Sequence, residues 1–103
     1  MRLLLVAASL VLAAPWAHAQ SAGDPLLGRN LAATCANCHG TNGNAQGDMK
    51  PLAGMAADKM IAMLADFKSG AQPATIMHQI VKGYTDEQIR LVADFFAAQK
   101  PAK

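Results

Sequence analysis

Two cysteines stand two residues apart, and a histidine follows the second one directly: Cys35, Cys38 and His39. If this segment is helical, the two thiols lie on neighbouring faces one turn apart and the imidazole projects beside them. Thiols at this spacing can each bond one vinyl group of a porphyrin, and the imidazole can then coordinate its iron. The pattern therefore predicts one covalently attached haem, with Cys35 and Cys38 in the thioether bonds and His39 on the iron.

The same cysteine pair has two other interpretations. A redox-active disulfide of the thioredoxin kind accompanies a strand, helix, strand pattern, and the sequence shows no alternating β-branched stretch of that sort. A zinc site needs two more thiols or imidazoles at suitable spacing, and the chain has only 2 cysteines. We therefore favour haem over a disulfide or zinc.

A second strong iron ligand would make the haem low-spin and suited to electron transfer. A thioether in that place raises the reduction potential relative to a second imidazole, because the softer sulfur favours Fe(II). The second ligand is thus expected to be a methionine or a histidine. Outside the N-terminal segment the candidates are Met49, Met55, Met60, Met63, Met77 and His78.

Position along the chain favours Met77 as the distal ligand. The first two methionines follow His39 too closely to reach round a porphyrin easily, and the next two fit an apolar helical stripe, where methionine usually fills gaps in a core. Met77 follows a loop that contains a proline, far enough along for the chain to have crossed the ring. His78, its neighbour, is the competing alternative.

The first helix must carry the chain into the cysteine motif. Asp24 and Pro25 read as a capping residue followed by proline at the first helical position, and the helix is expected to end near Thr34. Gly28 lies in the middle of this helix. Its missing side chain would let another helix approach closely.

The segment after the motif has loop composition. Residues 40–48 contain three glycines and two asparagines, so this loop can wrap closely around a haem edge. A metal-bound histidine usually donates its second ring N–H to a carbonyl. The carbonyl of Lys50 or Pro51 is the predicted acceptor for His39.

Two helices are expected in the middle of the chain. The first covers residues 56–69, has a broad apolar stripe and stops at Gly70. The second covers residues 76–82, with Thr75 as its cap and a glycine at its end.

The last helix is expected to begin with a capping box formed by Thr85 and Gln88 and to run to about residue 99. Its apolar stripe consists of Ile89, Val92, Ala93 and Phe96. Tyr84, just before it, could bond a haem propionate or cover the core.

The N-terminus has the pattern of a secretory signal peptide. Arg2 precedes an apolar run at residues 3–14, and Ala17-His18-Ala19 fits a cleavage site. The run is too short for a membrane span, which takes ~20 residues. We expect a signal peptide at residues 1–19, export to the periplasm, and one domain at residues 20–103 with no stable membrane span.

Charge makes nucleic acid an unlikely partner. The formal net charge is only +2, charged residues make up 16% of the chain, and no run of like charges occurs. A haem edge that must approach another cofactor is expected to lie in an apolar patch with few charges.

Several further stretches carry a family resemblance. They are Gly28-Arg29-Asn30-Leu31, Pro51-Leu52-Ala53-Gly54 and Ala93-Asp94-Phe95-Phe96. Together with the cysteine motif, they make residues 20–103 resemble the small class I cytochromes c. Phe67-Lys68-Ser69-Gly70, Thr75-Ile76-Met77 and Ile80-Val81-Lys82-Gly83-Tyr84-Thr85 resemble, more narrowly, the cytochrome subunit of flavocytochrome c sulfide dehydrogenases.

The resemblance implies an all-α class I cytochrome c fold, with about four helices around one covalently attached haem c. The first and last helices would cross, with Gly28 near Phe95. It assigns the thioether bonds to Cys35 and Cys38 and the axial iron positions to His39 and Met77. One departure is that Pro51 directly precedes Leu52, where relatives commonly have a residue between.

The resemblance also implies a periplasmic carrier of single electrons. Its haem would accept electrons from an FAD-containing sulfide dehydrogenase subunit and pass them to a downstream acceptor. The chain alone would catalyse nothing, because sulfide chemistry belongs to the flavoprotein. A freely diffusing carrier is the alternative, and a haem gas sensor or peroxidase-like enzyme is less favoured.

Overall fold

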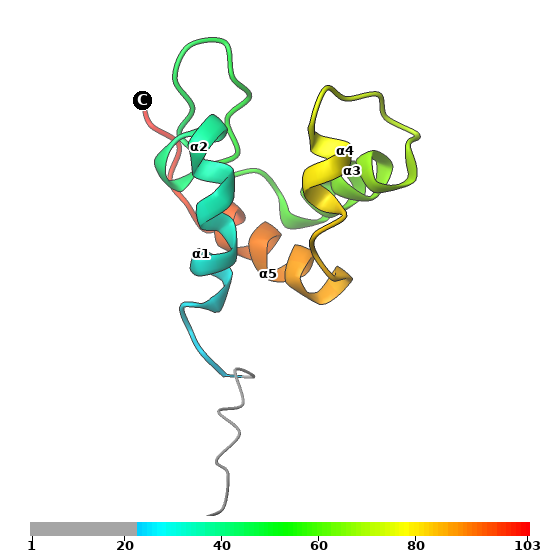
Figure 1. Ribbon diagram of the computed structural model, residues 1–103. Coiled ribbons are helices and arrows are strands. Elements are labelled where there is room, and N and C mark those ends of the chain that lie inside the picture. The colour runs from blue at the N-terminus through cyan, green and yellow to red at the C-terminus, as the bar shows by residue number, and fades with distance from the viewer. Residues whose placement is uncertain (1–22) are drawn as a thin grey trace, which may run out of the picture.

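The computed structural model describes residues 23–103 and contains only helices and loops within that range (Figure 1). The elements are α1 (Leu27–Ala32), the 3-10 helix η1 (Ala33–Cys35), α2 (Ala36–His39), the 3-10 helix η2 (Thr41–Gly43), α3 (Ala57–Ser69), α4 (Met77–Val81) and α5 (Asp86–Ala97). The all-α prediction is confirmed. The expected signal peptide at residues 1–19 lies outside the described residues.

Helices α1 and α5 pack against each other at the centre of the fold (Figure 1). A Cβ atom built on Gly28 would lie 2.8 Å from the backbone oxygen of Leu91 and 3.7 Å from the Cβ of Phe95. Any side chain at this position would force the helices apart. The predicted approach of the first and last helices at Gly28 is therefore confirmed.

The core is built on the apolar stripe of α5. Ile89, Val92, Ala93 and Phe96 are all buried, as their helical spacing predicts. Ala32 from α1 and Met60 from α3 join the same cluster as the last three of them. Met60 is therefore buried in the core as expected, whereas Met63, expected there too, is only half-buried.

Two predicted helix starts are wrong. Asp24 does not cap α1, because its Oδ1 accepts from the Leu26 N–H at 2.8 Å and holds a turn before the helix begins. Thr75 does not cap α4, because Ile76 occupies the capping position with φ −140° and no side-chain cap bond is formed. Both helices therefore begin later than predicted, at Leu27 and at Met77.

Other predicted helix boundaries are confirmed. Thr85 accepts from the Gln88 N–H at 3.1 Å, and the Gln88 side chain accepts from the Thr85 N–H at 2.9 Å, which completes the capping box of α5. Gly70 ends α3 with φ 85°, a left-handed conformation that glycine adopts without strain. These two local signals fix the beginning of the core helix and the end of α3.

Candidate haem site

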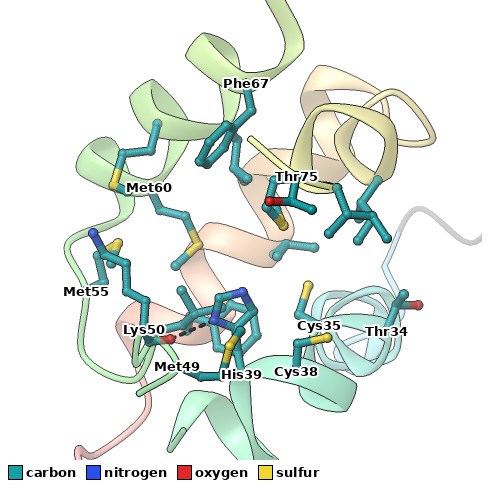
Figure 2. A pocket seen from close by; sticks show the side chains of 18 residues that line it. Thr34, Cys35, Cys38, His39, Met49, Lys50, Met55, Met60, Phe67 and Thr75 are labelled. Carbon is teal, nitrogen blue, oxygen red and sulfur yellow. Dashed lines mark hydrogen bonds between the residues drawn. The ribbon is translucent and has the colours of Figure 1, made fainter. Parts of the chain in front are cut away.

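His39 is the last residue of α2, and the loop that follows fixes its ring. Its Nδ1 lies 2.6 Å from the backbone oxygen of Lys50. A carbonyl can only accept, so Nδ1 carries the proton and the lone pair belongs to Nε2. Figure 2 shows this second ring nitrogen facing the cavity. Of the two carbonyls predicted from the sequence, that of Lys50 is the one that meets His39.

The loop reaches Lys50 by folding back on itself. Gly40 follows His39 with φ 80°, and a Cβ there would collide with the backbone oxygen of Asn44. The backbone oxygen of Gly43 then accepts from the N–H groups of Leu52 and Ala53, at 2.8 and 3.1 Å. Glycine is required where the two halves of this loop touch, and the glycine-rich composition thus places a carbonyl beside the imidazole.

Cys35 and Cys38 stand beside His39 along one side of the same cavity (Figure 2). Both are free thiols; Cys35 is half-buried and Cys38 exposed. Burial raises the pKa of the Cys35 thiol. Cysteines of redox-active disulfides have a lowered pKa instead, so the surroundings of Cys35 do not favour the disulfide alternative.

The cavity has a volume of about 340 Å³ and walls that are largely apolar. Its walls include Leu52, Leu64, Phe67, Ile80, Val92 and Phe96. They come from the loop, α3, α4 and α5, so elements far apart in the sequence border this space. An apolar cavity with two thiols and an imidazole on one side fits a porphyrin, whose flat faces are apolar and whose iron needs a nitrogen ligand.

Met77 reaches the cavity from a different part of the fold than His39. It is the first residue of α4, and Figure 1 shows α4 across the molecule from α2. All five methionines of the described range line this cavity: Met49, Met55, Met60, Met63 and Met77. The structure therefore brings Met77 to the same space as His39, as the predicted pair of ligands requires.

His78 lies outside the group of described residues that line the cavity. Its Nδ1 is buried and has no hydrogen-bond partner. The side chain as a whole is half-buried.

The Tyr84 hydroxyl donates to the backbone oxygen of Leu31 at 3.3 Å. This bond ties the turn before α5 to α1. Of the two roles considered for Tyr84, covering the core is the one that this contact supports.

Sequence reasoning missed two groups around the site. Ile80 lines the cavity one helical turn after Met77, and the spacing of three residues on a short helix was the signal for it. Asn44 binds the C-terminal segment through its side chain, at Lys100 and Ala102. No local sequence pattern predicts a contact between residues so far apart in the chain.

The described part of the chain holds no cluster of three or more His, Cys, Asp or Glu side chains that could bind a metal ion, so the zinc alternative lacks ligands there. Across residues 23–103, no helix has the length and apolar character needed to cross a bilayer.

Comparison with known proteins matches residues 26–100 to the cytochrome c family. The cytochrome subunit of sulfide dehydrogenase from Chlorobaculum tepidum is 39% identical over 69 residues, which cover 67% of this chain and 63% of the relative. Cytochrome c4 from Pseudomonas aeruginosa is 33% identical, over 80% of this chain and 41% of its own length. Cytochrome c-553 from Nitratidesulfovibrio vulgaris is 31% identical, over 94% of this chain and 98% of its own length. The chain thus spans less than two thirds of the first two relatives.

Proposed function

This chain belongs to the cytochrome c family and is a monohaem electron carrier, and from that premise we propose that it serves in the periplasm as the haem subunit of a sulfide-oxidising complex. An FAD-containing subunit would reduce it, and a downstream acceptor would take the electron away. The observation that carries the proposal is the 39% identity to the cytochrome subunit of a sulfide dehydrogenase.

In the proposal, four residues of this chain would hold the haem. Cys35 and Cys38 would bond it through thioethers, and His39 and Met77 would bind its iron. When bound, haem c supplies reversible one-electron exchange between Fe(III) and Fe(II). The Lys50 carbonyl, 2.6 Å from Nδ1, keeps the His39 ring in one orientation and one tautomer.

The apolar walls of the cavity would keep water away from a bound haem iron. Leu64 and Phe67 on α3 and Val92 and Phe96 on α5 all line this space, and all four side chains are apolar. A dry, low-dielectric site disfavours the extra positive charge of Fe(III) and so adds to the effect of a thioether ligand. Both effects favour a high reduction potential, which suits an acceptor of electrons from a flavin.

The rim of the cavity offers an apolar contact surface. Met49 is 44% exposed and Ile76 57% exposed, and both line the cavity. Thr34 and Thr75 also line the cavity and carry no charge, and Lys50 is the only lysine, arginine, aspartate or glutamate in the described lining. A flavoprotein with an apolar, weakly charged patch around its own cofactor would match this rim, because the central parts of interfaces are depleted of charge.

The test is reduction by the flavoprotein itself. The holoprotein is purified from its native cells with whatever it binds, and reduction of its haem by sulfide is followed with and without the copurified flavoprotein. We expect reduction to require the flavoprotein. A chain that copurifies with no flavoprotein is a free carrier, and rapid, tight binding of carbon monoxide to the reduced protein would favour a sensor or enzyme; either result contradicts the proposal.

A charge placed on the rim tests the docking surface. In the double variant Met49→Lys and Ile76→Lys, the rate of haem reduction by the flavoprotein should fall about tenfold. Each new ammonium group would have to lose its water at an apolar contact without gaining a partner, which slows association. The control is Leu26→Lys, an equally apolar side chain, 50% exposed, that does not line the cavity. Equal slowing in both proteins would show that the rim is not the docking surface.

A further inference from the structure

Asn44 connects the loop beside the haem cavity to the C-terminal segment. Its Nδ2 donates to the backbone oxygen of Lys100 at 3.2 Å, and its Oδ1 accepts from the N–H of Ala102 at 2.6 Å. One side-chain amide thus satisfies two backbone groups of a segment that has no helix of its own. The segment follows α5, the helix that carries the core.

The backbone around Asn44 is coupled to His39 along two routes. In the first, the Asn44 N–H donates to Thr41 at 3.1 Å, and its backbone oxygen packs on Gly40, the residue after His39. In the second, the preceding residue, Gly43, accepts from Leu52, two positions beyond the Lys50 carbonyl that holds the imidazole. If Asn44 moved, both His39 and the Lys50 carbonyl that it bonds would therefore be displaced.

The far end of the loop has its own attachment to α5. The Gly54 N–H donates to the backbone oxygen of Phe96 at 2.9 Å. Asn44 therefore supplies the second hydrogen-bonded attachment, among the described residues, between residues 40–54 and α5 with the chain that follows it. Leu52 on the core and Gly43 beside Phe96 add contacts by packing alone. Without the Asn44 amide, Gly54 would keep the one described hydrogen bond from this loop to α5, and the loop around Lys50 would be held less firmly.

We propose that Asn44 is a positioning residue for the proximal ligand: by clamping residues 100–102 to the loop, its amide holds the Lys50 carbonyl against Nδ1 of His39. The inference rests on the proposed role of His39 as an iron ligand. The acceptor carbonyl makes the imidazole more basic and so favours Fe(III). Loosening the clamp lowers that basicity and raises the reduction potential.

The test compares solvent exchange of the His39 ring N–H, followed by NMR of the holoprotein, in the wild type and in Asn44→Ala. We expect exchange about tenfold faster in the variant, since removing one to two hydrogen bonds shifts the local opening equilibrium by roughly that factor. The reduction potential should rise in the same variant. Asn30→Ala, the same substitution on the exposed face of α1, is the matched control and should change neither quantity.

Asn44→Asp keeps the acceptor for Ala102 but sets a carboxylate oxygen against the Lys100 carbonyl oxygen, so its exchange should also be faster than in the wild type. This variant decides the question if Asn44→Ala does not fold. The proposed role of Asn44 would be overturned if the Asn44 variants exchanged at the wild-type rate, or if Asn30→Ala accelerated exchange equally. A wild-type holoprotein in which the His39 ring shows no sign of iron ligation would instead refute the proposed ligand set.

Discussion

At the scale of single residues, the site depends on groups that are each fixed by a specific neighbour. The His39 ring is oriented by a carbonyl at 2.6 Å, and that carbonyl is presented by a loop whose glycines permit its close return. Spacing alone predicted that the two cysteines and the histidine bind a haem. It did not decide which of two carbonyls accepts from His39, because the path of a glycine-rich loop depends on contacts that spacing does not encode.

Tyr84 gives a prediction at this scale. In Tyr84→Phe the bond to Leu31 is lost, and we expect the free energy of unfolding to fall by about 1 kcal/mol, the usual net contribution of one hydrogen bond. The reduction potential should not change, because the contact lies between α1 and the turn before α5. Denaturant unfolding and redox titration of the holoprotein measure both quantities. An altered potential with unchanged stability would show that the hydroxyl bonds a propionate instead.

At the scale of elements, the crossing of α1 and α5 places the cysteine motif. Helix α1 leads through η1 directly into α2, so the angle at which α1 meets α5 decides where both thiols and His39 lie. The stripe of α5 and the glycine of α1 were readable in the sequence, because periodicity and the lack of a side chain are local properties. The starts of α1 and α4 could not be predicted in this way, because neither helix begins with the side-chain cap that its sequence suggests.

Gly28→Ala tests this crossing. The new Cβ would stand 2.8 Å from the Leu91 backbone oxygen, so one helix must move, and we expect a loss of about 1–3 kcal/mol in the free energy of unfolding. Gly83→Ala is the control, since a Cβ there meets its nearest atom, the Ile80 oxygen, only at 3.4 Å. Thermal or denaturant unfolding of the holoproteins gives both values. Equal losses in the two variants would mean that helix contact at Gly28 does not limit stability.

At the scale of the whole molecule, separate elements surround the apolar cavity that has His39 and Met77 in its lining. Residues from the cysteine motif, the loop, α3, α4 and α5 all border it. Family resemblance and periodicity predicted this architecture from the sequence. The clamp between Asn44 and the C-terminal segment was not predictable in this way, since it joins residues 56 and 58 positions apart.

The central claim is that the haem is held by His39 on one face and by Met77 on the other. Proton NMR of the reduced holoprotein tests it most directly, because the ring current of a porphyrin shifts the methyl group of a methionine ligand far upfield. We predict one such three-proton resonance, present in the wild type and in Met63→Leu and lost in Met77→Ala. The account would be contradicted if the wild type showed no such resonance, or if the resonance were still present in Met77→Ala.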